Sequence, residues 1–177
     1  DNYIKKMDAI FTTKPSSDYS YYGFKIHEIL EMELAGMGQY AHGNQPIQHA
    51  IYLYNYAQQP WKTQEKVRYV MDNLYGSGAD GYCGDEDNGQ TSAWFVFSSL
   101  GFYPVAPVTG QYVIGSPLFE EVSIKLSNGK ELKINAHKNS DKNIFINSFK
   151  FNQLESNNNW IDHSNLKEGG IIDFEMS

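Results

Sequence analysis

The spacing of the apolar residues changes once along this chain, near residues 104–111, and that change constrains the fold most strongly. Before it, apolar residues recur every three or four positions, as in amphipathic helices. After it, short runs alternate apolar and polar residues, which is typical of strands that bury one face. Pro104, Pro107 and Gly110 interrupt both patterns at the junction. We therefore expect an α+β chain, helical over residues 1–104 and built of antiparallel strands over residues 105–177.

The helical part carries recognisable start signals. Pro46 and Pro60 each suit the first turn of a helix, where a missing N–H costs no intrahelical hydrogen bond. Asn44 lies just before the first of these prolines and is a suitable N-terminal cap. Gly36 is a stop signal after the second apolar run. These signals predict helices over residues 2–12, 26–34, 46 onward, 60–74 and 90–100.

The second part carries one strong hairpin signal, Asn128-Gly129, because this pair favours the tight turns that connect antiparallel strands. Two alternating runs flank it, and three more lie elsewhere in this part. The alternation predicts strands over residues 112–114, 122–126, 132–135, 144–147 and 171–174.

Composition excludes several classes of function. The chain has 21 acidic and 14 basic residues, a net charge of −7, and no basic stripe, so we expect no nucleic-acid partner. Aromatic residues make up 15% of the chain, which fits a folded protein whose rings either fill the core or stack on sugars. Cys83 is the single cysteine, so no internal disulfide can form. No run is long and apolar enough to predict a membrane-spanning helix.

Two polar loops, at residues 40–49 and 80–90, each lead into a helix, and the second contains three consecutive acids. Asp85, Glu86 and Asp87 repel one another unless a cation or a proton lies among them. In an extended loop, Asp85 and Asp87 would face one side, where one could bind a hard cation and the other could deprotonate water. A solvated acidic loop in which Asp87 or Asn88 caps the next helix explains the same residues equally well.

An EF-hand does not explain this loop. Starting from Asp85, the fifth, sixth and twelfth positions hold Gly89, Gln90 and Val96, none of which matches the EF-hand pattern.

His42 and His49 flank the other loop and could contact a sugar hydroxyl or a metal, although a histidine near a helix start is more often simply hydrogen-bonded.

Six strings in these loops and around them resemble the calcium-dependent α-mannosidases of glycoside hydrolase family 92. The resemblance runs from about residue 42 to residue 119, in an order and spacing that chance does not explain. The strings are GNQPIQH (43–49), YLYNYA (52–57), QPWKT (59–63), GYCGDEDNGQTSAW (81–94), LGFYP (100–104) and GSPLF (115–119).

The resemblance implies part of an (α/α) helical barrel, residues 1–104 of a catalytic domain, followed by a C-terminal antiparallel β-sheet or sandwich region. It implies an exo-acting hydrolase that removes terminal α-linked mannose from glycans with inversion and depends on calcium. By position, Asp85 and Asp87 match the general-base carboxylates, and Asn44, Gln45 and Asp87 match the calcium site. The implied substrate contacts are His42, His49 and Glu86.

The resemblance also implies that residues 1–177 make up only part of the enzyme. The family's general acid is a glutamate upstream of residue 1, whereas Glu28, Glu31 and Glu33 fit solvated positions of a helix. Only four or five helices are visible, and a closed barrel of paired helices needs about twelve. We therefore expect a fragment that is inactive alone and self-associates through an exposed barrel face. The intact bacterial protein is expected to be exported, to the periplasm or the cell surface.

Two further expectations concern specificity and alternative functions. Some family members carry Glu at the position of Gln45 and His at that of Gln48, so these positions are expected to affect linkage preference. A calcium-assisted carbohydrate-binding module without catalysis is the main alternative function. A half-domain with only a structural role is a third possibility.

Overall fold

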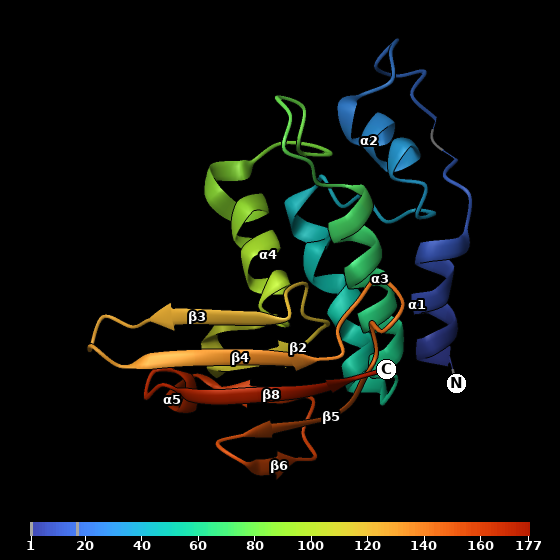
Figure 1. The fold of residues 1–177 in the computed structure, drawn as a ribbon. Coiled ribbons are helices and arrows are strands. Elements are labelled where there is room, and N and C mark those ends of the chain that lie inside the picture. The colour runs from blue at the N-terminus through green and yellow to red at the C-terminus, as the bar shows by residue number, and fades with distance from the viewer. Residues whose placement is uncertain (1, 17) are drawn as a thin grey trace.

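A computed structural model describes residues 2–16 and 18–177 of the chain, so Asp1 and Ser17, both in the expected helical part, lie outside the described residues. Helices occupy the first half, as expected from the apolar spacing, and they stand on one side of a β-sheet (Figure 1). The longer helices are α1 (Asn2–Thr12), α2 (His27–Ala35), η1 (Gln45–Ala57), α3 (Pro60–Asn73) and α4 (Gln90–Ser99). Short helical turns are η2 (Asp87–Gly89), η3 (Pro107–Thr109) and α5 (His163–Leu166).

The helix that begins before Pro46 is a 3₁₀ helix of 13 residues. The sequence predicts a helix there, but not its tighter winding. With three residues per turn, residues three apart lie on one face. Gln48, Ile51 and Tyr54 follow this spacing, and all three are fully buried. The winding therefore determines that the Gln48 side chain points into the protein.

The strands form two sheets. One has the order β1-β2-β7, from β1 (Phe102–Tyr103), β2 (Gln111–Ile114) and β7 (Trp160–Asp162), and both of its pairings are antiparallel. The other has the order β3-β4-β8-β5-β6. Its strands are β3 (Glu121–Lys125), β4 (Glu131–His137), β5 (Ile146–Phe151), β6 (Leu154–Ser156) and β8 (Gly170–Met176).

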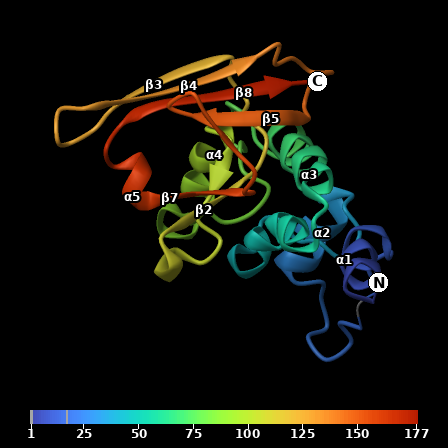
Figure 2. The same ribbon diagram turned by 90° about the horizontal axis from the view of Figure 1, so that it is seen from below.

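Most pairings in the larger sheet are antiparallel, as expected, but one pairing is parallel and was not predicted. β4 and β8 run parallel, from Leu132 opposite Gly170 to His137 opposite Glu175. Figure 2 shows β8 between β4 and β5. Alternation within a strand indicates which residues face the core, but it does not indicate the direction of the neighbouring strand. The Asn128-Gly129 turn joins β3 and β4 as expected, with Lys125 paired to Glu131.

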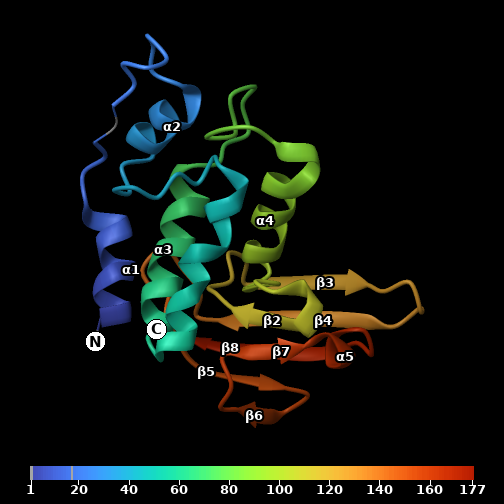
Figure 3. The ribbon, with the colours of Figure 1, turned by 180° about the vertical axis from the view of Figure 1, so that it is seen from behind.

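Two apolar clusters form the core. The first lies among η1, α3 and α4 and includes Tyr52, Val67 and Trp94, each fully buried. The second lies against the larger sheet and includes Ile134, Ile172 and Phe174. Figure 3 shows α4 descending from the helical part onto the sheets. Partly buried Phe97, on α4, packs against both clusters and so links them.

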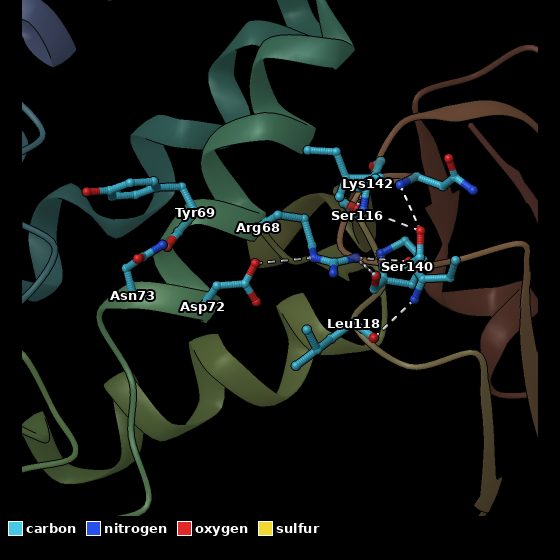
Figure 4. A network of polar contacts seen from close by, with 12 residues as sticks. Arg68, Tyr69, Asp72, Asn73, Ser116, Leu118, Ser140 and Lys142 are labelled. Atoms are coloured by element: carbon cyan, nitrogen blue, oxygen red, sulfur yellow. Dashed lines mark hydrogen bonds and ion pairs between the residues drawn. The ribbon is translucent and has the colours of Figure 1, made fainter.

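Buried polar side chains join the helices to the strands. Arg68, on α3, donates through Nη1 to the carbonyl of Pro117 at 3.0 Å and to Oδ1 of Asn139 at 2.9 Å. Asn139 in turn donates to the carbonyl of Leu118, while Arg68 Nε faces Asp72 at 3.9 Å (Figure 4). Arg68 is 3% exposed, so its hydrogen bonds are shielded from water. They hold the helical part against the loop before β3.

Candidate functional site

The two polar loops meet at the end of the helices that lies away from the larger sheet (Figures 1 and 3). The loop between α3 and α4 is green in both views and lies beside α2. The contact is made by Gly43 and Gly84. A Cβ on Gly84 would lie 2.5 Å from Gly43 Cα, and a Cβ on Gly43 would lie 2.6 Å from the carbonyl oxygen of Cys83. No side chain fits at either position, so glycine is required there by close approach.

The Gly43–Gly84 contact brings predicted site residues from both loops to one place. Asn44 directly follows Gly43, and Asp85 directly follows Gly84. The Asp85 side chain is 74% exposed and lines a cavity of about 570 Å³ that also includes Tyr75 and Tyr82. A carboxylate placed in this way is accessible to a ligand in the cavity.

Helix α2 lies over this contact and contributes two groups, His27 and Glu31, that were not predicted from the sequence. His27 Nε2 lies 3.7 Å from Asp85 Oδ2. Glu31, one turn later on α2, lies across both glycines, because a Cβ at Gly43 or Gly84 would be 2.8 Å from its Oε2. The sequence signal was present in the spacing of four residues, which places His27 and Glu31 on one helix face.

Glu31 therefore does not occupy the solvated helix position expected from the sequence. Burial is the main reason that the pKa of its carboxyl is raised above the usual value, and His27 opposes this effect. The negative charges of Asp85, Glu28 and Asp87 raise the pKa further. Both predicted catalytic carboxylates thus lie within electrostatic reach of Glu31.

The backbone at Asp87 is unusual. Asp87 and Asn88 have φ values of 55° and 56°, and Gly89 has a φ of 102°, so three consecutive residues are left-handed. Aspartate and asparagine tolerate this region better than other side chains, but it still costs free energy. The loop is also not extended at Glu86, which has helical angles of −72° and −25°. The simple alternation expected for residues 85–87 is therefore absent.

Glu86 acts as the cap of this turn. The Gly89 N–H donates to Glu86 Oε2 at 2.6 Å, and the Ser92 hydroxyl donates to Oε1 at 2.6 Å. These bonds hold the pKa of Glu86 below its ordinary value, with the Ser92 bond contributing most. The N-cap of the next helix, α4, is Gly89, so neither Asp87 nor Asn88 caps that helix. Both oxygens of Glu86, an expected substrate contact, are bonded within the protein.

The two histidines of the first loop have different environments. His42 is fully buried, with Nδ1 2.7 Å from the Tyr40 hydroxyl and Nε2 2.8 Å from the Tyr75 hydroxyl. Its ring also packs edge-on against Trp94, and burial lowers its pKa to about 3. His42 is therefore a neutral core residue in this structure and offers no surface to a sugar. His49 is exposed.

The predicted calcium residues fit the metal in chemistry. Asn44 and Gln45 are exposed, Asp87 is partly exposed, and the Asn44 side chain makes no capping bond to η1. Amide and carboxylate oxygens are the donors that calcium takes in proteins. Among residues 2–16 and 18–177, no three His, Cys, Asp or Glu side chains are grouped to hold a metal. A calcium site made of the predicted residues would therefore combine two amides with one carboxylate.

Comparison with models of known protein families identifies the family of this chain. The model of the glycosyl hydrolase family 92 catalytic domain matches residues 1–177. The chain belongs to glycosyl hydrolase family 92.

Solved structures of family 92 proteins share its fold. The α-mannosidase BT3965 from Bacteroides thetaiotaomicron is 35% identical with a TM-score of 0.87, and the match covers 99% of this chain and 22% of that one. The inverting mannosidase BT2199 from the same organism is 52% identical with a TM-score of 0.80, covering 98% and 24%. A protein named an uncharacterized secreted glycosidase, from Arthroderma benhamiae, is 30% identical over 137 residues, 76% of this chain and 18% of the relative. The chain thus spans about a fifth of the length of each of these three proteins.

Within the described part of the chain, no helix is both long enough and apolar enough to cross a membrane.

Proposed function

We propose that this chain supplies part of the catalytic centre of an exo-acting, inverting, calcium-dependent α-mannosidase. The observation that carries the proposal is the Gly43–Gly84 contact, which joins the loop of Asn44 and Gln45 to that of Asp85 and Asp87 in a family 92 chain. The names of the two B. thetaiotaomicron relatives support mannose as the sugar, and one of them supports inversion.

The roles follow from exposure and bonding. Asp85 is exposed and faces the cavity, so we assign it, together with Asp87, the task of accepting a proton from the attacking water. In an inverting hydrolase, the base stands roughly 6.5–9.5 Å from the general acid to leave room for that water. We assign the acid to a residue outside these 177, so that the isolated chain is inactive.

The remaining assignments concern binding. Asn44, Gln45 and Asp87 would hold calcium, which when bound supplies a positive charge that orients sugar hydroxyls. His49 is retained as a sugar contact because it is exposed. For His42 and Glu86 we propose supporting roles, since their polar atoms are bonded within the protein.

The name of the A. benhamiae relative supports export of the intact protein, and N-glycans and mannans are the proposed glycan sources. Exposed apolar residues near α2, Phe24 at 64% and Leu34 at 84%, are where an isolated chain would self-associate.

The test is mannose release from a panel of α-linked mannobiosides by the intact protein that carries this chain. Activity should disappear with a chelator, return with calcium, and be lost in Asp85→Asn or Asp87→Asn. Calcium binding with no cleavage of any linkage would instead favour a carbohydrate-binding role. The position of the acids weighs against that alternative, because they lie between α3 and α4 and not on strand loops.

A further inference from the structure

We infer that Gln48 and Thr91 are positioning residues that determine where the loop of Asp85 and Asp87 lies relative to the loop of Asn44 and Gln45. The inference rests on the proposed function for its effect on catalysis, but not for its effect on the loop. It concerns two fully buried polar side chains that no substrate can reach in this structure.

Gln48 binds the first loop. Its Nε2 donates to the carbonyl of His42 at 3.1 Å, directly before the Gly43 contact. The same nitrogen donates to Oγ1 of Thr91 at 3.2 Å, so both amide hydrogens are used. Oε1 accepts a hydrogen bond from Gln90 Nε2 at 3.3 Å. One side chain from η1 thus bridges the first loop and the start of α4.

Thr91 continues the bridge to the acidic loop. Having accepted from Gln48, its hydroxyl donates to the carbonyl of Asp85 at 2.9 Å. Its backbone N–H donates to the carbonyl of Glu86 at 3.1 Å. Thr91 therefore holds two successive carbonyls of the loop, those of the Asp85–Glu86 and Glu86–Asp87 peptide bonds. The path runs from His42 through Gln48 and Thr91 to Asp85 without a gap.

This path gives position 48 a way to affect the reaction without touching the substrate. Because Gln48 is fully buried, its side chain is not accessible to a sugar in this conformation. A different side chain at this position would act by moving the acidic loop. Displacement of a reacting group by about 1 Å can cost on the order of 100-fold in rate, so a small movement is sufficient.

The experiment removes one link at a time from the intact protein. Thr91→Val keeps the shape of the side chain but has no hydroxyl, and Thr91→Ser keeps the hydroxyl. Gln48→Met breaks the same path from the other end, in case Thr91→Val folds poorly. Thr63→Val is the matched control, because Thr63 is also fully buried and donates its hydroxyl to a carbonyl, that of Ile51 at 2.8 Å on η1.

The first readout is hydrogen exchange in peptides that cover residues 84–90. We expect Thr91→Val and Gln48→Met each to raise exchange there by about tenfold, as for a loop whose local opening becomes easier. Thr91→Ser and Thr63→Val should leave exchange there as in the wild type. In the double variant Thr91→Val with Gln48→Met, exchange at residues 84–90 should be no faster than in either single variant, since both substitutions break the same path.

The second readout is mannobioside hydrolysis. We expect kcat to fall by about 10- to 100-fold in Thr91→Val and Gln48→Met, with KM changed by less than about threefold and kcat restored in Thr91→Ser. Unchanged exchange at residues 84–90 in both variants would overturn the inference, whatever the activity. Raised exchange in a protein whose wild type cleaves no mannobioside would support the positioning role and refute the proposed function.

Discussion

Gly43 and Gly84 contact each other backbone to backbone, and a Cβ on Gly84 would lie 2.5 Å from Gly43 Cα. The glycosyl hydrolase family 92 signature of this chain includes both residues within separate strings, 43–49 and 81–94. Their contact explains why glycine occupies each position although neither has the positive φ that usually requires it. Because of this contact, neither loop can move without the other. Adding one methyl group at either glycine tests this.

Gly84→Ala should destabilise the protein by about 1–3 kcal/mol, the usual range for overpacking, because the new methyl meets backbone that cannot rotate away. It should also abolish mannobioside hydrolysis if both loops form the site. Urea unfolding measures the stability. Gly76→Ala is the matched control in the same loop, since its nearest neighbour would be 3.7 Å away. Equal stabilities for the two variants would show that the glycine contact is not tight.

His42 should make stability depend on pH. Its folded pKa is lowered to about 3 by burial, while the unfolded value is near 6.5. The unfolded chain therefore binds the extra proton between these values, and stability falls as pH decreases from about 6.5 towards 3. The slope from this one group approaches about 1.4 kcal/mol per pH unit.

The comparison that isolates this effect is His42→Gln, which cannot titrate. We expect it to be less stable than the wild type at pH 7, because the hydrogen bonds to the Tyr40 and Tyr75 hydroxyls are disturbed. The gap between the two proteins should narrow from pH 7 to pH 5 in urea unfolding. A constant gap over that range would show that His42 titrates normally.

Arg68 should matter through its hydrogen bonds to Pro117 and Asn139 more than through its ion pair. Arg68→Lys keeps the charge but loses the planar guanidinium group. We expect the free energy of unfolding, measured by chemical denaturation, to fall by about 1–3 kcal/mol. Asp72→Asn removes the partner 3.9 Å away, on a side chain that is 48% exposed, and should cost less than about 0.5 kcal/mol. The reverse order of costs would assign the stabilisation to the ion pair.

The three consecutive acids should separate into structural and functional groups. Glu86→Ala removes the acceptor for Gly89 N–H and Ser92 Oγ, so we expect a Tm lower by about 2–4 °C. Asp85→Asn should leave Tm unchanged, because that side chain is 74% exposed, yet it should abolish hydrolysis. Calorimetry and the mannobioside assay together test both. A large fall in Tm for Asp85→Asn would assign Asp85 to the fold.

Local signals in the sequence predicted local structure well. The helix over residues 2–12 matches α1, the left-handed Gly36 ends α2, and Asn128-Gly129 joins β3 to β4. These features depend on residues close together in the chain. The short strands β1, β6 and β7 were not predicted, because two or three residues show no alternation.

Features that depend on distant segments could not be predicted from the spacing. The parallel pairing of β4 with β8 joins segments more than thirty residues apart, and the Gly43–Gly84 contact joins two loops. The spacing of four residues placed Glu31 on one helix face with His27, but its position over both glycines depends on how α2 packs. The resemblance of the strings to family 92 identified the loops, but the separate roles of Glu86 and His42 depend on their contacts.

The position of β8 has a consequence for the order of folding. β8 follows β3, β4, β5 and β6 in the chain, yet it lies between β4 and β5. During synthesis, the two halves of this sheet therefore exist before the strand that joins them. Each half exposes an unpaired edge until residues 170–176 emerge from the ribosome, and open edges favour pairing with other chains. The nascent chain is consequently most vulnerable to aggregation late in its synthesis, after most of its core residues have already been made.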